Sequence, residues 1–185
     1  MCIEIEAKLK VDSHSQVKEK LVEIGGEFLE EQLQRDYYFD NTNSTLSKTD
    51  RALRLRRQLA GEREKFILTY KGAREKGQLK TRQEIEVEVA DGDMTRKLLS
   101  AIGYEMALVF EKKRRLWQVG VCSVALDELP LLGCFVEIEG PDGEIITEVQ
   151  RKLGMAKLPH ITESYAFLMA ARVHQLGKAE KEVFF

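Results

Sequence analysis

Residues 3–11 read IEIEAKLKV, and apolar and charged side chains alternate along the whole stretch. Period-two alternation predicts a β-strand with two unlike faces. The charged face could meet bulk water, or it could line an interior. The apolar positions are Ile3, Ile5, Ala7, Leu9 and Val11, and the charged positions are Glu4, Glu6, Lys8 and Lys10.

Similar short stretches follow along the chain, separated by polar loops or by segments with helical spacing. A first helix is expected after Asp12 or Ser13, and Gly25 would end it. The connections are mostly short enough for hairpins, which favours an antiparallel sheet, and sufficient curvature would close it into a barrel. Further strands are expected at 35–41, 51–59, 64–72, 83–90, 108–120, 121–129 and 133–140, and further helices at 91–103, 141–154 and 162–176.

We therefore predict an α+β fold, an eight-stranded antiparallel β-barrel with helices packed outside. Residues 1–175 would form a single domain, and residues 176–185 a C-terminal tail. The sequence also contains an internal repeat pattern, in which EIEAKLKV, EIEVEVAD and VEIEGPDG each precede a stretch that ends in glycine. This repeat pattern is either a coincidence among charged strands or a sign of a pseudo-symmetric sheet with acids on a shared face.

Composition limits the function classes. The chain has 185 residues, 32% of them charged, a net charge of −2 and a pI near 6.0, so no nucleic-acid-binding surface is indicated. No apolar run reaches membrane-spanning length, and the N-terminal residues lack a signal-peptide core. The three cysteines have no C-x-x-C spacing, which favours reduced thiols and a cytoplasmic location. The sequence predicts no oligomeric state.

Full charges of both signs recur on one face of most of the expected strands. A solvated outer face is the ordinary explanation for any single strand, but an open sheet would mix Thr, Ser and Gln among such positions. If the sheet closes, an interior of charges is tolerable only when water, ions or a charged ligand pair them. Carboxylates suit Mg²⁺ or Mn²⁺, and Arg and Lys suit phosphate oxygens, so the mixture predicts a metal-bound polyphosphate.

The ordered series of charged motifs resembles the CYTH superfamily, the triphosphate tunnel metalloenzymes. EIEAK at 4–8 matches the E-x-E-x-K signature of that family. LRLR, TYKG, RQEIEVE, EKKRRLW, ALDEL and FVEIE follow in the family's order, and the resemblance covers about residues 1–170. DYYFD at 36–40 and ESY at 163–165 are similar to the branch that includes class IV adenylyl cyclases.

The resemblance implies a tunnel that binds a triphosphate together with Mg²⁺ or Mn²⁺. Lys8 is additionally a candidate catalytic residue that positions water. The K-x-R motif could be Lys112/Arg114 or, in the opposite register, Lys113/Arg115, and the first fits better. The implied triphosphate contacts are Lys8, Arg54, Arg56, Lys71, Arg82, Lys112 and Arg114. The implied metal ligands are Glu4, Glu6, Asp127, Glu137 and Glu139, with Glu84 and Glu86 as supporting acids.

Three functions fit these residues. A class IV adenylyl cyclase would convert ATP to cyclic AMP and pyrophosphate, and the branch resemblance favours this interpretation. A triphosphatase would hydrolyse inorganic triphosphate or an organic one such as thiamine triphosphate. A non-catalytic polyphosphate or nucleotide binder is the third, although an anion binder gains nothing from many carboxylates unless they hold metal. All three share a small triphosphate ligand and need neither nucleic acid nor membrane.

Overall fold

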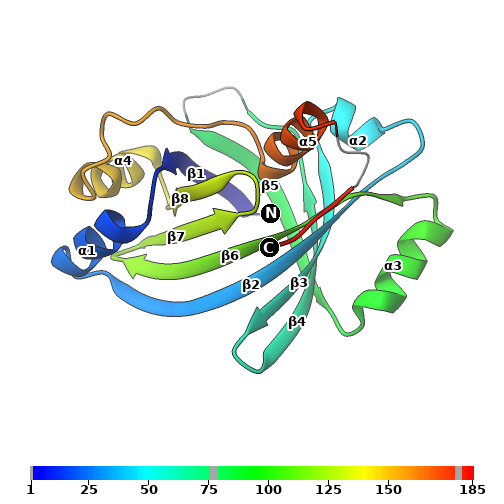
Figure 1. The fold of residues 1–185 in the computed structure, drawn as a ribbon, viewed down its shortest axis with the longest axis horizontal. Helices are drawn as coiled ribbons and strands as arrows, with labels where there is room; N and C mark the ends of the chain where they lie inside the picture. The colour runs from blue at the N-terminus through cyan, green and yellow to red at the C-terminus, as the bar shows by residue number, and fades with distance from the viewer. Residues whose placement is uncertain (1, 76–78, 178–180) are drawn as a thin grey trace.

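The structure is a computed structural model and describes residues 2–75, 79–177 and 181–185. Its strands belong to one sheet of nine strands (Figure 1). The strands are β1 (Cys2–Val11), β2 (Glu27–Asp40), β3 (Ala52–Ala60), β4 (Arg63–Lys71), β5 (Lys80–Val89), β6 (Glu105–Val119), β7 (Cys122–Leu129), β8 (Gly133–Glu139) and β9 (Glu182–Val183). The helices are α1 (Ser15–Glu23), α2 (Thr45–Lys48), α3 (Gly92–Ala101), α4 (Gly143–Lys152) and α5 (Tyr165–Gln175).

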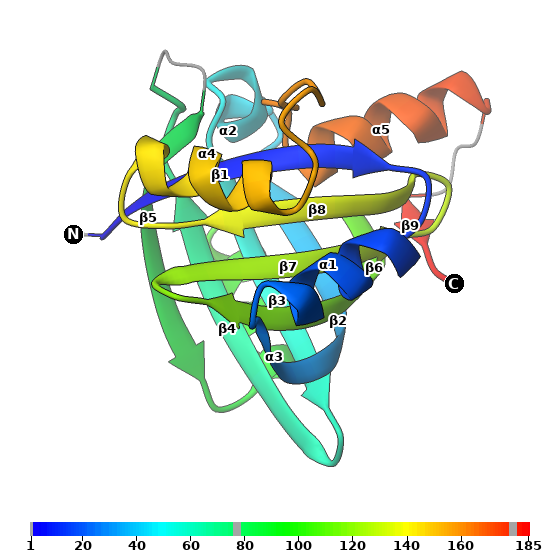
Figure 2. The ribbon, with the colours of Figure 1, turned by 90° about the vertical axis from the view of Figure 1, so that its left-hand side faces the viewer.

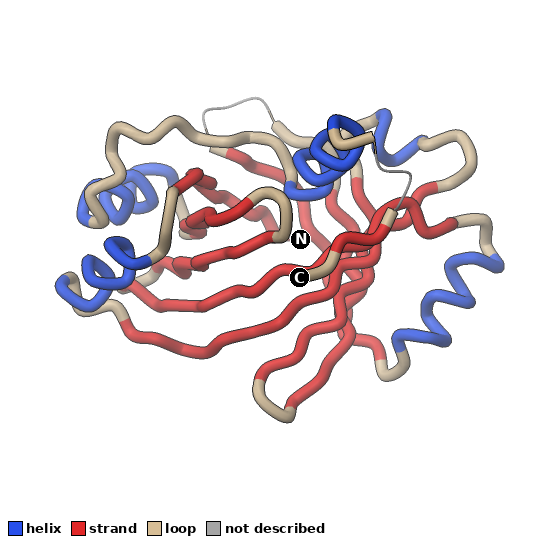
Figure 3. Tube along the Cα trace, in the orientation of Figure 1, coloured by secondary structure: helices blue, strands red, loops and turns tan. Residues whose placement is uncertain are grey.

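The first eight strands close into an antiparallel barrel, as predicted. Their order around the barrel is β2-β3-β4-β5-β1-β8-β7-β6, and β6 pairs back with β2. This closing pair runs from Glu27 opposite Gln118 to Asp40 opposite Glu105. Figure 3 shows the strands gathered in the middle of the molecule with the helices around them. Closure gives the sheet an inside, and alternate residues of each strand must face it.

The apolar side of β1 packs outward, beneath two helices. Leu9 and Ala7 lie in a core cluster with Leu21 of α1 and Ile146 of α4. In Figure 2, α1 and α4 lie across the side of the barrel built from β1, β7 and β8. Because the apolar face of the 3–11 stretch is used here, its charged face is left to the barrel interior.

The last helix packs against a second apolar cluster. Tyr165 and Met169 of α5 contribute to it, and so does Phe110 of β6. A third and smaller cluster joins Leu99 of α3 to Leu55 of β3. Among the described residues no helix is long and apolar enough to cross a membrane.

Several strands begin earlier than expected, since β6 starts at Glu105 rather than near residue 108 and β2 departs further. β2 begins at Glu27 rather than near residue 35, and a register shift between Phe28 and Glu30 interrupts its pairing with β6. After this shift the buried positions before residue 35 are Gln32 and Gln34, so the first half of the strand lacks the apolar period-two signal. The short α2 was also not predicted.

The C-terminal tail, expected beyond residue 175, includes a strand of its own. Glu182 and Val183 form β9, which pairs parallel with Val109 and Phe110 of β6. Val183 is buried in the cluster that also holds α5. The last four residues are therefore part of the packed structure.

Candidate functional site: a charged tunnel

The barrel encloses a cavity of about 440 Å³ whose wall is built almost entirely from charged side chains. Apart from Asp127, every residue predicted from the sequence for the site lines this cavity. The lining consists of Glu4, Glu6, Lys8, Asp36, Tyr38, Ala52, Arg54, Arg56, Lys71, Arg82, Glu84, Glu86, Lys112, Arg114, Glu137, Glu139, Ser164 and Tyr165.

Strand parity brings these residues together. Glu4, Glu6 and Lys8 alternate with apolar residues along β1, and all three face the cavity. Lys8 is only 1% exposed, and its Nζ lies 3.5 Å from Glu6 Oε1 and 3.3 Å from Glu137 Oε1. Lys8 Nζ also donates to the Glu163 carbonyl at 3.0 Å. The charged face of the 3–11 stretch therefore lines an interior rather than meeting bulk solvent.

The register of the K-x-R motif is Lys112/Arg114. Both residues line the cavity, whereas the intervening Lys113 has its ammonium group 4.1 Å from the Phe185 ring centroid. Arg115 pairs with Glu31 at 3.0 Å. Lys113 and Arg115 have the opposite parity, so they belong to the outer face of β6.

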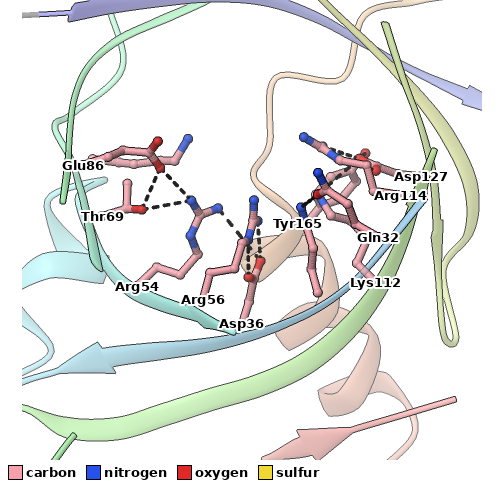
Figure 4. Close-up of polar contacts among 12 residues, drawn as sticks. Gln32, Asp36, Arg54, Arg56, Thr69, Glu86, Lys112, Arg114, Asp127 and Tyr165 are labelled. Atoms are coloured by element: carbon pink, nitrogen blue, oxygen red, sulfur yellow. Dashed lines mark hydrogen bonds and ion pairs between the residues drawn. The ribbon is translucent and has the colours of Figure 1, made fainter. Parts of the chain in front are cut away.

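Asp36 and Arg56 form a buried pair on one wall of the cavity (Figure 4). Arg56 donates from Nε to Asp36 Oδ1 at 2.6 Å and from Nη2 to Oδ2 at 2.7 Å. Burial alone would raise the pKa of Asp36, but the charges of Arg56 and Arg54 hold it well below its ordinary value. Asp36 is thus a fixed anion that orients arginine.

Asp127 and Arg114 form a second pair on the neighbouring strands β7 and β6, shown on the right of Figure 4. Arg114 donates to both Asp127 oxygens, at 2.7 and 2.6 Å, and also contacts Glu137. Lys112 Nζ lies 3.2 Å from Asp127 Oδ2, and the Tyr165 hydroxyl donates to the same oxygen at 3.0 Å. Asp127 is 0% exposed and does not line the cavity. These contacts favour a role in orienting bases over the metal-ligand role expected from the sequence.

Lys112 lies among the cations of this region. Burial and then the charge of Arg114 lower the pKa of Lys112 to about 7, and Arg56 acts in the same direction. Asp127 opposes the shift without cancelling it. An anionic ligand near Lys112 would relieve this repulsion.

The carboxylates gather at another part of the wall. Lys71 Nζ lies 3.0 Å from Glu4 Oε2 and 2.6 Å from Glu84 Oε2. Burial, followed by the charges of Glu4, Glu6 and Glu84, raises the pKa of Glu139 to about 7. These carboxylates repel one another when they are all ionised, and a bound divalent cation would stabilise their ionised forms.

The donor set therefore suits a hard divalent cation, although the geometry is not preassembled. Across residues 2–75, 79–177 and 181–185, no group of three or more His, Cys, Asp or Glu side chains converges closely enough to hold an ion. Lys71 lies between two of the carboxylates that would take part. Binding of a cation would require these side chains to rearrange.

Arg82 has more unpaired donors than Arg54, the other cavity arginine with a buried Nε that lacks a partner within the described residues. It is 2% exposed, and its Nε and Nη2 have no hydrogen-bond partner within the described part of the chain. Its ion-pair partner is Asp50, whose Oδ1 lies 3.8 Å from Nη2. Buried guanidinium donors without acceptors are costly, and phosphate oxygens would satisfy them.

Comparison with known proteins agrees with this geometry. The sequence model of the CYTH domain matches residues 2–165. The chain belongs to the CYTH domain family. A Methanocaldococcus jannaschii protein named "Putative adenylate cyclase" is 30% identical over 172 residues, which cover 88% of this chain and 96% of that protein.

Solved structures of CYTH-like proteins share the fold. A protein of Pyrococcus horikoshii OT3 has a TM-score of 0.81 and 30% sequence identity, covering 91% of this chain and 99% of that one. A Hippeastrum protein has a TM-score of 0.68 and 20% identity, covering 97% and 98% of the two chains. It is described as a "Putative adenylyl cyclase" that reveals a dominant triphosphatase activity.

The CYTH motifs do not account for the whole cavity wall. Asp36 and Tyr165 appear in the sequence analysis only within the stretches DYYFD and ESY, and neither was predicted as a site residue. Asp36 occupies an inward position on β2, two residues from Gln34, so strand parity could have placed it inside. Nothing in the sequence indicates that Tyr165 reaches the cavity, since that depends on where α5 packs.

Proposed function

We propose that this CYTH protein is a metal-dependent enzyme that binds a triphosphate in the tunnel. The observation that carries the proposal is a cavity wall that combines carboxylates with cations and includes unpaired donors on the buried Arg82. Many wall charges pair with one another, but the Arg82 donors have no acceptor and Glu139 lies among other carboxylates. An anion would satisfy the first and a cation would relieve the second.

The cationic residues would hold the triphosphate. Arg82 offers its buried Nε and Nη2, and Arg56 and Arg114 are held by Asp36 and Asp127. Arginines fixed in this way lose little conformational entropy on binding phosphate oxygens. Lys8 would position an oxygen of the ligand or an attacking water. The full proposed set is Lys8, Arg54, Arg56, Lys71, Arg82, Lys112 and Arg114.

The carboxylates would hold Mg²⁺ or Mn²⁺. Glu4, Glu6, Glu137 and Glu139 are the proposed ligands, with Glu84 and Glu86 in support, and Asp127 is assigned to orienting bases instead. A bound divalent ion supplies neutralisation of phosphoryl charge and lowers the pKa of a coordinated oxygen. The protein keeps these acids close to the cations, so both ends of a metal–triphosphate complex have partners in one cavity.

For the reaction, we favour cyclisation of ATP to cyclic AMP and pyrophosphate, because the 30%-identical relative carries the adenylate cyclase name. Hydrolysis of inorganic or organic triphosphate is the second candidate, supported by the activity described for the Hippeastrum protein. The cavity wall suits both reactions, since each needs charge neutralised on phosphoryl oxygens. We propose a cytoplasmic location, in agreement with the free thiols of Cys122 and Cys134.

Product analysis distinguishes these reactions. The protein is incubated with ATP, inorganic triphosphate or thiamine triphosphate, each with Mg²⁺ or Mn²⁺, and the products are separated by chromatography. Cyclic AMP and pyrophosphate from ATP, with 3′-deoxy-ATP bound but not converted, would support the cyclase. Orthophosphate as the main product, with inorganic triphosphate preferred, would support the triphosphatase. Absence of turnover with every triphosphate would leave a binding protein.

A further inference from the structure

Tyr165 joins the last helix to the cations of the tunnel. It is the first residue of α5, is buried, and lines the cavity. Its ring centroid lies 4.3 Å from Lys8 Nζ and 5.0 Å from Lys112 Nζ. The two lysines come from β1 and β6, so one aromatic ring contacts ammonium groups from separate strands.

An aromatic ring is a suitable neighbour for two like charges. Its face carries negative quadrupole potential, which attracts ammonium groups, most strongly where water is excluded. Lys8 and Lys112 are 1% and 2% exposed, so bulk water screens their charges little. A leucine at this position would be smaller and would not offer this attraction.

The ring is held in place from several sides. The hydroxyl donates to Asp127, and Phe135 meets the ring edge-on with centroids 5.2 Å apart. Burial and the charge of Asp127 raise the pKa of Tyr165 well above its ordinary value, so the hydroxyl stays a donor. The preceding segment follows β1, since Ile161 donates its amide to the Lys8 carbonyl at 2.8 Å.

We propose that Tyr165 is a positioning residue whose ring gathers the ammonium groups of Lys8 and Lys112 on the wall of the triphosphate site. The inference rests on the proposed function, because it assigns both lysines to triphosphate binding. The ring sets where the two charges lie before the ligand arrives, and the hydroxyl ties that arrangement to Asp127. Loss of the ring would let the lysines move apart and weaken binding of the anion.

The first test measures binding of inorganic triphosphate by calorimetry in EDTA, so that no metal contributes, and below pH 7, so that Lys112 is charged. Tyr165→Leu should weaken binding by about tenfold, whereas Tyr165→Phe, which keeps the ring, should stay within about threefold of wild type. Phe167→Leu is the matched control, because Phe167 lies on the same helix and is 62% exposed. Wild-type affinity in Tyr165→Leu would overturn the inference, and so would equal losses in the Leu and Phe variants.

A second test separates the ring's electrostatics from its packing. Phenylalanine at position 165 is compared with its difluoro and trifluoro analogues, which keep the ring shape and weaken its negative face. Affinity should fall stepwise with fluorination while the melting temperature of the ligand-free protein stays nearly constant. A flat series would show that the ring acts by packing alone. If wild type binds no triphosphate in EDTA, the same series is measured with saturating Mg²⁺. Absence of binding in wild type under both conditions means that the proposed function fails, and that outcome is distinct from either result.

Discussion

Asp36 lies directly opposite Arg56 across the β2–β3 ladder, and both oxygens of its carboxylate accept hydrogen bonds from that guanidinium. Asp127 stands in the same relation to Arg114 across β6–β7. In each case a buried aspartate on one strand fixes the arginine of its neighbour. Two walls of the tunnel thus carry arginines that are oriented before any ligand binds.

The arginine pair at 56 and 57 gives a matched test of the tunnel. Arg56 faces the cavity, whereas Arg57 is outside, 43% exposed and paired with Glu64. A charge-assisted hydrogen bond contributes about 1.5–3 kcal/mol, so Arg56→Ala should weaken triphosphate binding by about tenfold or more. Arg57→Ala should change it little. Calorimetric titration measures both, and equal losses would show that the ligand does not bind inside the barrel.

Removing charge from Asp127 should affect stability and anion binding but not metal affinity. Asp127→Asn removes the buried anion that Arg114 and Lys112 share and leaves Arg114 with Glu137 alone, and breaking a buried pair costs about 3–5 kcal/mol. We expect a large fall in the urea midpoint and weaker triphosphate binding. Mn²⁺ affinity, measured by electron paramagnetic resonance, should stay near that of wild type. A loss of Mn²⁺ binding with normal stability would instead make Asp127 a ligand.

The carboxylates should control metal dependence. EDTA should abolish turnover, and Mg²⁺ or Mn²⁺ should restore it. Glu6→Gln and Glu139→Gln should each lower activity by about a hundredfold or more, because each removes a proposed ligand charge. Glu148→Gln, on the exposed face of α4, is the control. Full activity in EDTA, with no metal detected by elemental analysis, would contradict the assignment.

The empty tunnel should have an unusual pH profile of stability. The pKa of Glu139 rises from 4.5 to about 7 on folding, so its contribution to stability falls as pH increases between those values. The pKa of Lys112 falls from 10.5 to about 7, so its contribution increases as pH rises from 7 toward 10.5. Together these groups predict a stability minimum near pH 7. Glu139 is exposed, so solvent screens the repulsion from its neighbours and reduces its contribution to the pH dependence of stability.

Single variants separate the two limbs of that profile. In thermal melts, Glu139→Gln should flatten the limb between pH 4.5 and 7, and Lys112→Gln the limb above pH 7. A wild-type profile with a maximum near pH 7 in ligand-free protein would mean that neither charge is strained.

Ligands should relieve the same strain. Mg²⁺ and triphosphate together, each at about a hundredfold excess over its dissociation constant, should stabilise the fold by at least about 2.7 kcal/mol through mass action. Differential scanning fluorimetry would register this as a higher melting temperature. An unchanged melting temperature in the presence of both ligands would show that the cavity does not bind Mg²⁺ and triphosphate together.

The sequence predicts side-chain faces well and side-chain partners poorly. Alternation in the 3–11 stretch was sufficient to place Glu4 and Lys8 on one face, because the period of a strand is fixed by its geometry. It could not show that Asp127 lies behind the cavity wall with its oxygens used by Arg114 and Tyr165. That depends on which side chain reaches furthest inward, a result of three-dimensional packing. The first half of β2 was missed for a related reason, since its buried positions, Gln32 and Gln34, are polar and give no apolar periodicity.

The closing seam between β2 and β6 has a consequence for how the chain folds. Asp127 and Arg114 are 13 residues apart in the sequence, and Asp36 and Arg56 are 20 residues apart. Arg35 and Glu111, which pair across the seam, are 76 residues apart. Contacts close in sequence form fastest, because they close short loops. We therefore expect the strand pairs β2–β3 and β6–β7 to form early and the pairing of β2 with β6 to form late. In stopped-flow refolding, Arg35→Ala should mainly speed unfolding, whereas Asp36→Asn should slow folding.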